Sequence, residues 1–335
     1  MIRFLLLGYG HIGKRHATLI EVHPEARLEG TIDVDKGKWI NKKPFFTSLE
    51  EFLTSGGQAD VAVIALPNGL HLPMAKKAVR AGMHVLIEKP MGLSSSSCGE
   101  LIELAKDLNR QVFVVKQNRY SPPSIWMKEV LESGQLGKIF EVHIRCFWNR
   151  DKRYYQVGPK SEINWRGTKE LDGGVLFTQF SHFIDVMYWV FGDIQNIQTR
   201  LFNHNHTDST EFADSGMVHF EFRNGGVGSI QFSTSVFEEN MESSMTVLAE
   251  NGAFKIGGQY MDRIEFAHIK DYNVPEIKES LPPNDYGGYK GSAGNHAFVI
   301  QNVIDVLKHN APIATRGEDG MKVVEIIEKI YAAAE

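Results

Sequence analysis

The chain has 335 residues, of which 42% are hydrophobic and 23% are charged, and its formal net charge is −5. This length allows two domains, while so mild a charge gives no electrostatic reason to expect nucleic acid or an anionic membrane as a partner. The two cysteines, Cys98 and Cys146, form neither a disulfide framework nor a metal-binding spacing, which favours a reducing, cytoplasmic location.

A glycine-rich turn follows the first predicted strand. Residues 2–7 form an apolar run that is too short to span a membrane and indicates a buried strand. This run leads directly into a G-x-G-x-x-G turn, after which residues 14–22 have the pattern of a helix. In such a turn the first glycine allows the sharp bend, the second lets a pyrophosphate approach the backbone, and the third lets helix and strand pack closely. The turn residues expected to contact a dinucleotide are Gly8, Gly10, His11, Ile12 and Gly13.

Asp33 ends the second predicted strand, residues 27–32, and lies about 20 residues beyond the glycine-rich turn. A carboxylate at this position accepts hydrogen bonds from a ribose 2′-hydroxyl and repels a 2′-phosphate, so it favours NAD over NADP. Asp35 is a second candidate, although its place beside Gly37 is more typical of a turn residue.

Strands and helices then alternate up to about residue 120, which predicts a parallel sheet with right-handed crossovers. Ligands bind such a sheet beyond the carboxyl ends of its strands. Lys89 falls there, because the apolar strand 83–87 ends in Glu-Lys-Pro, where the proline stops the strand and could aim the amine through a cis bond. Taken alone, charged residues such as Glu88 and Lys89 are more often simply solvated. Other predicted strands are 61–65 and 112–115, the helices are 50–54, 70–81 and 98–108, and further polar candidates are Pro67, Asn68, His71 and Gln117.

The second half of the chain is richer in strands. Strands with few helices between them indicate a mostly antiparallel sheet, so we expect a Rossmann domain at 1–120 and an α+β domain with a large open sheet at 121–335. An open sheet has one face to cover, which favours a homodimer or homotetramer formed through it. The strands are expected at 138–148, 194–202, 215–222, 228–232, 245–248 and 264–267, and the helices at 124–131, 176–191, 297–308 and 318–333.

Polar residues gather on or near the predicted helix 176–191. Thr178, His182 and Asp185 are spaced by four and three residues and would share one face of this helix. Trp165 and Arg166 lie in the preceding loop, where an arginine could bind a phosphate or carboxylate through two parallel hydrogen bonds. A packed histidine, a surface arginine and a buried tryptophan are the structural alternatives. Tyr120, Asn164 and His296 are further candidates for substrate contact, although His296 could equally be packed under the helix that it precedes.

The chain resembles the Gfo/Idh/MocA family, which includes glucose–fructose oxidoreductase and inositol dehydrogenase. The resemblance covers essentially the whole chain. It implies a Rossmann domain followed by an α/β domain with a large open sheet, and NAD(P)-dependent redox chemistry on a hydroxyl of a sugar, a cyclitol or a related compound. The motifs that carry it are the glycine-rich turn, Pro-Asn-Gly-Leu-His at 67–71, Glu-Lys-Pro at 88–90, Gln-Asn-Arg-Tyr at 117–120, Trp-Arg-Gly at 165–167, and Gly-Gly at 173–174 followed by His182 and Asp185.

By this resemblance Lys89 matches the catalytic lysine of the family and His182 its catalytic histidine. Both would handle the hydroxyl proton while hydride moves between carbon and the nicotinamide. Members with a polyol dehydrogenase pattern carry an aspartate four residues before the histidine, where this chain has Thr178. This departure argues against simple inositol dehydrogenase activity and leaves sugars and sugar nucleotides, including UDP-linked uronates, as substrate classes.

The sequence therefore predicts an NAD-dependent oxidoreductase that acts on a secondary hydroxyl or ketone of a carbohydrate. Two alternatives stay open, namely a non-catalytic dinucleotide sensor and an enzyme that cycles a tightly bound NAD. A metal site is not expected, since no group of histidine, cysteine and carboxylate residues has ligand spacing. The expected cofactor contacts are Gly8, Gly10, His11, Ile12, Gly13, Asp33, Pro67, Asn68, His71, Glu88, Lys89, Gln117, Trp165 and Arg166, and the expected substrate contacts are Lys89, Tyr120, Asn164, Arg166, Thr178, His182 and His296.

Overall fold

The computed structural model describes the chain apart from residues 39–43, 156–164, 286, 288 and 335. The described residues form two compact units. The first contains residues 1–116 and 296–324, and the second contains residues 117–295 and 325–335. The compact units differ from the predicted domains at 1–120 and 121–335, because the segment 296–324 packs with the N-terminal residues. The assignment of cofactor binding to 1–120 and substrate binding to 121–335 stays a prediction.

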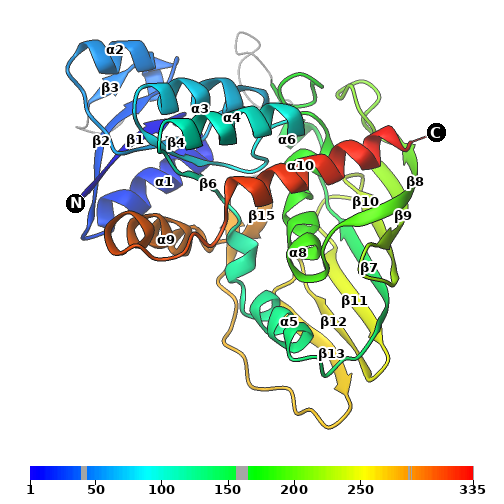
Figure 1. Ribbon diagram of the computed structural model, residues 1–335. Coiled ribbons are helices and arrows are strands. Elements are labelled where there is room, and N and C mark those ends of the chain that lie inside the picture. Colours follow the sequence, from blue (N-terminus) through cyan, green and yellow to red (C-terminus); the bar gives the residue numbers. More distant parts are fainter. Residues whose placement is uncertain (39–43, 156–164, 286, 288, 335) are drawn as a thin grey trace. The chain divides into compact units, whose positions relative to one another are not determined.

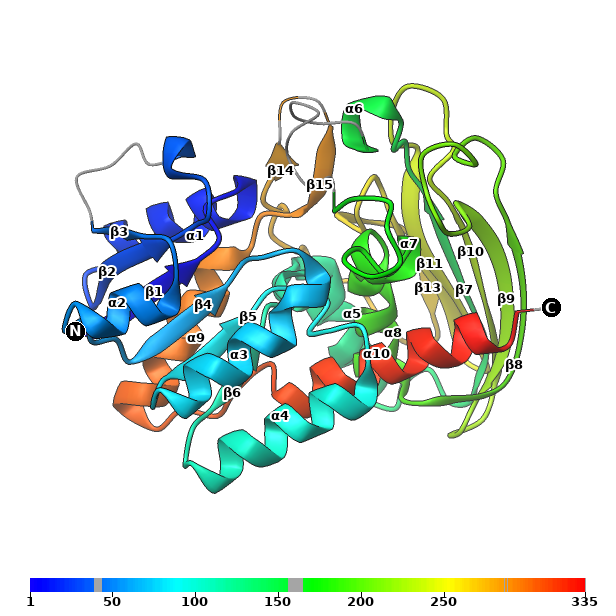
Figure 2. The ribbon, with the colours of Figure 1, turned by 90° about the horizontal axis from the view of Figure 1, so that it is seen from above.

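A six-stranded parallel sheet forms the centre of the first unit, with the strand order β3-β2-β1-β4-β5-β6. Its central strands are apolar throughout, and all four residues of β4 are fully buried. A strand that is buried on both faces needs helices on both faces. In Figures 1 and 2, α3 and α4 lie on one side of this sheet and α1 and α9 on the other. The strands are β1 Ile2–Leu7, β2 Ala26–Ile32, β3 Phe45–Phe46, β4 Val61–Ile64, β5 His84–Ile87 and β6 Val112–Val114, and the helices are α1 His11–Val22, α2 Leu49–Thr54, α3 His71–Arg80, α4 Ser95–Asp107 and α9 His296–His309.

A seven-stranded sheet forms the second unit, with the strand order β13-β12-β11-β7-β10-β9-β8. Among the described strands of this sheet, β7 and β10 pair in parallel and the other neighbours pair antiparallel, so the sheet is mostly antiparallel. The predicted fold class is confirmed. The strands are β7 Ile139–Phe147, β8 Ile194–Phe202, β9 Ser215–Phe222, β10 Val227–Ser233, β11 Glu242–Ala249, β12 Gly252–Gly257, β13 Arg263–Ile269 and the separate pair β14 Pro283–Asp285 and β15 Lys290–Ala293, and the helices are α5 Pro122–Glu132, α6 Lys152–Tyr155, α7 Val175–Thr178 and α8 Ser181–Phe191, with α10 Gly317–Ala332 shared between the units.

The two faces of the seven-stranded sheet differ. Helices α5 and α8 lie against one face in Figures 1 and 2. On the other face the strand register aligns large apolar side chains that are exposed by 37% to 56%. Within the described residues no helix covers this outer face, which fits the predicted use of the sheet for association but does not test it. Its exposed apolar residues include Phe202, Met217, Leu248 and Phe266.

The predicted single helix 176–191 is wrong, because the structure divides it into α7 and α8. The Phe180 N–H donates to the carbonyl oxygen of Val175, five residues earlier, at 3.2 Å. The Phe180 ring packs against Trp148 and Phe232, with centroids 5.4 and 6.0 Å away. Tertiary packing of this ring therefore overrides the local helical pattern.

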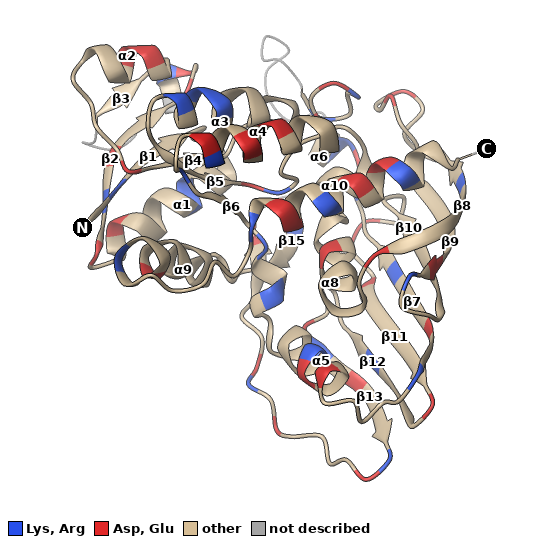
Figure 3. Cartoon of the chain, in the orientation of Figure 1, with Lys and Arg blue, Asp and Glu red and all other residues tan. Residues whose placement is uncertain are grey.

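Charged residues are spread over both units. Figure 3 shows acidic and basic positions interspersed along the helices and strands, as the mild net charge leads one to expect. In the part of the chain that the structure describes, no helix has the length and apolar character needed to cross a membrane.

Candidate functional site

The glycine-rich turn joins β1 to α1, and its three glycines have different surroundings. Gly8 has a φ of +97°, and a Cβ there would lie 2.2 Å from the Ala65 carbonyl oxygen. A Cβ at Gly13 would lie 2.0 Å from the Gly8 carbonyl oxygen, so backbone contacts exclude side chains at both positions. A Cβ at Gly10 would meet no heavy atom within 4 Å, which leaves open space at the N-terminus of α1, where phosphate groups bind favourably. The predicted contacts His11 and Ile12 are the first two residues of α1.

Asp33 directly follows β2 and is only 9% exposed. The Tyr9 N–H donates to its Oδ2 at 2.8 Å, and the Asp35 N–H donates to its Oδ1 at 3.0 Å. The first bond ties the carboxylate to the glycine-rich turn. Each carboxylate oxygen accepts more than one hydrogen bond, so this position suits a ribose hydroxyl donor. Asp35 itself accepts the Gly37 N–H at 2.9 Å and acts as a turn residue.

His71 connects the ends of two neighbouring strands. Its Nδ1 lies 2.8 Å from the Pro90 carbonyl oxygen, and its Nε2 lies 2.8 Å from the Leu66 carbonyl oxygen. Burial lowers the pKa of the imidazole, although both carbonyl groups oppose the shift. The histidine thereby holds the turn after β4, which contains the predicted residues Pro67 and Asn68, against the Lys89–Pro90 peptide, whose bond is cis.

Glu88 and two histidines form a buried cluster in the first unit. The His16 Nε2 lies 2.7 Å from Glu88 Oε1, and the His296 Nε2 lies 3.6 Å from the same oxygen. Glu88 Oε2 accepts the Lys89 N–H at 3.1 Å. His16 comes from α1, Glu88 follows β5 and His296 begins α9, and their exposed fractions are 0%, 4% and 1%. The cluster therefore fixes the backbone at Lys89 from two helices.

The charges of this cluster follow from its burial. Burial alone would raise the pKa of Glu88, but the hydrogen bond and charge of His16 outweigh it and lower the pKa to about 2. Burial lowers the pKa of His296 to about 3, although Glu88 opposes the shift. At neutral pH Glu88 is therefore ionised and His296 is neutral. The expected contacts of Glu88 with a cofactor and of His296 with a substrate stay predictions.

The same three side chains, His16, Glu88 and His296, are also of types that bind metal ions, and their ligand atoms all lie within 4.8 Å of one another. A search of the sequence for ligand spacing cannot find such a group, because its members come from distant segments. The prediction that the chain has no metal site remains untested.

Helix α8 is fixed by a buried ion pair in the second unit. The Arg119 Nε and Nη2 atoms donate to the two carboxylate oxygens of Asp185 at 2.9 and 2.7 Å. Both side chains are at most 5% exposed, and the guanidinium lies 5.5 Å from the centroid of the Trp189 ring. Asp185 therefore positions α8, which carries His182, and its carboxylate is engaged by Arg119.

Arg166 lies between aromatic rings. Its guanidinium carbon is 4.9 Å from the Trp165 ring centroid and 5.0 Å from that of Tyr154. Burial alone would lower the pKa of Arg166, but Tyr154, Tyr289 and Asp172 outweigh this effect and raise it. Arg166 Nε is buried and has no hydrogen-bond partner among the described residues, so this cation can still bind an anionic group.

Asp172 is fully buried and joins two segments that carry candidate residues. The Gly167 N–H donates to its Oδ2 at 2.8 Å. The Thr178 hydroxyl donates to Asp172, whose Oδ1 and backbone carbonyl oxygen both lie within hydrogen-bond distance. The Trp165–Arg166–Gly167 segment and the end of α7 are therefore tied to one carboxylate.

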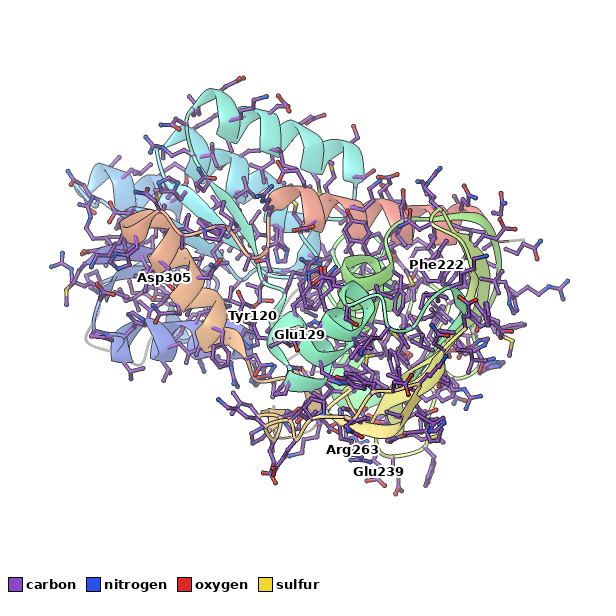
Figure 4. All side chains as sticks on the ribbon, turned by 60° about the horizontal axis from the view of Figure 1, so that its bottom comes forward. Tyr120, Glu129, Phe222, Glu239, Arg263 and Asp305 are labelled. Atoms are coloured by element: carbon purple, nitrogen blue, oxygen red, sulfur yellow. The ribbon has the colours of Figure 1, made fainter. Side chains whose placement is uncertain are left out.

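The remaining predicted residues also have defined places. Gln117 and Tyr120 begin and end the 3₁₀ turn η3 (Gln117–Tyr120), and Figure 4 labels Tyr120. Burial raises the pKa of Tyr120 to about 12, so its hydroxyl is neutral at ordinary pH. Thr178 and His182 are 8% and 6% exposed, while Asn164 lies outside the described residues. The first unit thus holds the glycine-rich turn, Asp33, Lys89 and His296, and the second holds Gln117, Tyr120, Arg166, Thr178 and His182.

The sequence interpretation missed His16 and the role of Asp172. His16 shares the buried face of α1 with Gly13, Ala17 and Ile20. A polar residue on such an apolar stripe needs a buried partner, and this signal was available in the sequence. The partners of Asp172 lie five and six residues away, Gly167 in irregular backbone and Thr178 at the end of α7, and neither helical nor strand spacing predicts them.

Comparison with known proteins adds the following findings. Residues 2–116 match the family model described as "Oxidoreductase family, NAD-binding Rossmann fold", and residues 125–255 match the model of the GFO/IDH/MocA C-terminal domain. An oxidoreductase of Formosa agariphila is 28% identical over 62% of this chain and 62% of its own length. The uncharacterized oxidoreductase YdgJ of Escherichia coli is 32% identical over 57% of this chain and 54% of its own length. The chain thus matches only about half to three fifths of the length of these relatives.

A solved structure is similar over nearly the whole chain. It is the WlbA dehydrogenase of Bordetella pertussis in complex with NADH and UDP-GlcNAcA, with a TM-score of 0.85 and 29% identity over 99% of this chain and 96% of the other.

Proposed function

Because the chain belongs to the Gfo/Idh/MocA family of oxidoreductases, we propose that it is an NAD-dependent dehydrogenase acting on a UDP-linked uronate. It moves hydride between the nicotinamide and a secondary hydroxyl or ketone of the sugar. One observation carries the substrate class: the similarity, over 99% of the chain, to a dehydrogenase whose structure contains NADH and UDP-GlcNAcA.

The proposed cofactor is NAD rather than NADP. Support comes from Asp33, whose carboxylate is held beside the glycine-rich turn by the Tyr9 N–H. A negative charge there accepts the hydrogen of a ribose 2′-hydroxyl and repels a 2′-phosphate. The open space at Gly10 fits a pyrophosphate against the backbone at the N-terminus of α1.

Lys89 and His182 handle the proton in the proposed reaction. Oxidation of the secondary alcohol removes a hydride from carbon and a proton from oxygen, and leaves a ketone. The nicotinamide, when bound, supplies the hydride acceptor. Lys89 accepts the hydroxyl proton as a neutral amine, on a backbone that Glu88 fixes through its carboxylate. His182 takes the second proton-handling role, on α8, which the Arg119–Asp185 pair holds in place.

We further propose that the chain forms a homodimer or homotetramer through the outer face of the seven-stranded sheet. The exposed residues Phe202, Met217, Leu248 and Phe266 support this face as the contact. Light scattering should find an oligomer at micromolar concentration, and Met217→Glu should shift it toward the monomer. A monomeric wild-type chain would exclude the proposal.

The test of the proton-handling roles compares Lys89→Ala and His182→Asn with Lys106→Ala, which alters a lysine that is 76% exposed on α4. With NAD and UDP-GlcNAcA, Lys89→Ala should lower kcat by roughly 10²- to 10⁴-fold, the usual share of general acid–base catalysis. NADH binding, followed by its fluorescence, should be unchanged, and Lys106→Ala should behave as the wild type. Wild-type turnover in Lys89→Ala would falsify the role of this lysine.

A further inference from the structure

We infer that Asp172 is a positioning residue for this reaction: it binds the hydroxyl hydrogen of Thr178, so that Thr178 Oγ1 offers only acceptor lone pairs to a hydroxyl group of the sugar. The Asp172–Thr178 pair thereby gives the site an uncharged acceptor that suits an anionic sugar. This inference rests on the proposed function and deepens it, because it names what selects a uronate.

The direction of the Thr178 hydrogen bond follows from the chemistry of its neighbours. A hydroxyl has one hydrogen to donate and two lone pairs that accept. The Oδ1 and the backbone carbonyl oxygen of Asp172, which lie within hydrogen-bond distance of the Thr178 hydroxyl, are acceptors only. The hydroxyl hydrogen is therefore committed to Asp172, and toward any other group Thr178 Oγ1 acts as an acceptor.

Asp172 is held firmly enough to set this direction. It is 0% exposed, and its Oδ2 accepts the Gly167 N–H at 2.8 Å. Its own N–H donates to the Thr168 carbonyl oxygen at 3.1 Å. Asp172 also makes a small contribution to the raised pKa of Arg166, as a negative charge does near a cation. Asp172 is therefore an anchored anion that faces Thr178 with one oxygen.

The segment after Thr178 contains buried polar groups. Gln179 is 3% exposed, and neither its Nε2 nor its Oε1 has a hydrogen-bond partner among the described residues. The Ser181 hydroxyl, which is 0% exposed, also has none there. Buried polar groups are nearly always paired in folded proteins. Gln179 and Ser181 therefore offer buried polar groups that a polar ligand can satisfy, in the segment between Thr178 and His182.

An uncharged acceptor matters because of the charge of the substrate. An aspartate at position 178 would also accept a hydroxyl hydrogen, but it would place a negative charge next to the sugar. A uronate and its diphosphate are negative, and like charges repel strongly in a partly buried site. In this chain the carboxylate is that of Asp172, which is hydrogen-bonded to Thr178. Thr178 can therefore accept a hydrogen bond from the sugar without placing a negative charge in contact with it.

The experiment compares four variants, with saturating NAD and with UDP-GlcNAcA as the probe. Thr178→Val removes the acceptor at nearly constant shape, and Thr178→Ser keeps it. Asp172→Asn removes the charge, and the double variant Asp172→Asn/Thr178→Val tests whether the two residues act together. Loss of one hydrogen bond of this kind should lower kcat/KM by roughly 10- to 100-fold in Thr178→Val and in Asp172→Asn. Thr178→Ser should restore the wild-type value, and the double variant should be no worse than the poorer single variant.

A fifth variant, Thr178→Asp, tests selectivity. It should lower kcat/KM for UDP-GlcNAcA more than for the uncharged-sugar analogue UDP-GlcNAc, relative to the wild type. An equal effect on both compounds would overturn the charge argument.

The outcomes separate this inference from the proposed function. Three results would overturn the inference but leave the proposed dehydrogenase intact, provided that the wild type turns over UDP-GlcNAcA. They are a wild-type kcat/KM in Thr178→Val, a lowered kcat/KM in Thr178→Ser, and additive losses of kcat/KM in the double variant. No binding or turnover of UDP-GlcNAcA by the wild type would overturn both. If Asp172→Asn does not fold, the comparison of Thr178→Val with Thr178→Ser still decides, because neither variant alters the buried carboxylate.

Discussion

Replacing His296 with glutamine should remove a specific loss of stability in acid. His296 is 1% exposed, and burial lowers its pKa from 6.5 to about 3. Between these two values the unfolded chain binds one proton that the folded chain does not bind. The free energy of unfolding therefore falls as the pH falls from the unfolded pKa toward the folded pKa. The stability that the chain loses in this way is fully present only above the unfolded pKa.

The magnitude follows from these two pKa values. Between about pH 6 and about pH 5 the unfolded histidine becomes almost fully protonated, so this one group should cost the folded state about 1.2 kcal/mol. Glutamine does not titrate, and its amide can still donate to Glu88. The difference in unfolding free energy between the wild type and His296→Gln should therefore shift by about 1.2 kcal/mol over this interval.

The assay is urea unfolding at the two pH values, followed by circular dichroism. His219→Gln is the matched control, because His219 is an exposed histidine on β9. The control should keep the pH dependence of the wild type. If His296→Gln instead loses as much stability as the wild type between the two pH values, His296 is protonated in the folded chain, and the neutral assignment is refuted.

Three further predictions concern both units. Gly10→Ala should keep the thermal unfolding midpoint but weaken NADH binding measured by fluorescence, whereas Gly13→Ala should lower the midpoint; the reverse pattern would contradict the assigned roles. Asp185→Asn should destabilise the chain by about 3–5 kcal/mol in urea unfolding, because the buried charge of Arg119 would lose its carboxylate partner, and an unchanged midpoint would exclude this. Asp33→Ser should raise the affinity for NADP relative to NAD in a binding titration, and an unchanged ratio would argue against cofactor selection by Asp33.

The parallel sheet and the glycine-rich turn were predictable because local signals are strong there. Continuous apolar runs predict the strands. The spacing of Gly8, Gly10 and Gly13 is typical of the turn between the first strand and first helix of a dinucleotide-binding fold, where side chains would collide with the backbone. The structure adds what spacing alone cannot give, namely that backbone atoms exclude a Cβ at Gly8 and Gly13 while Gly10 faces open space.

The polar clusters were not predictable, because their members meet only in the folded chain. One cluster contains His16, Glu88 and His296, which are far apart in the sequence. His296 joins it because the chain re-enters the first unit at residue 296, after forming most of the second unit. The helical spacing of residues 178–185 was misleading, since the packing of Phe180 divides the helix.

The most direct test of the central proposal is the nicotinamide absorbance of the purified chain mixed with NAD and UDP-GlcNAcA, alongside UDP-GlcNAc, free hexoses and inositols. We predict that NADH forms with UDP-GlcNAcA, and that the rate falls when the uronate carboxylate is absent. No formation of NADH with any of these compounds would contradict the proposed dehydrogenase and would favour a dinucleotide sensor or a cycle on bound NAD.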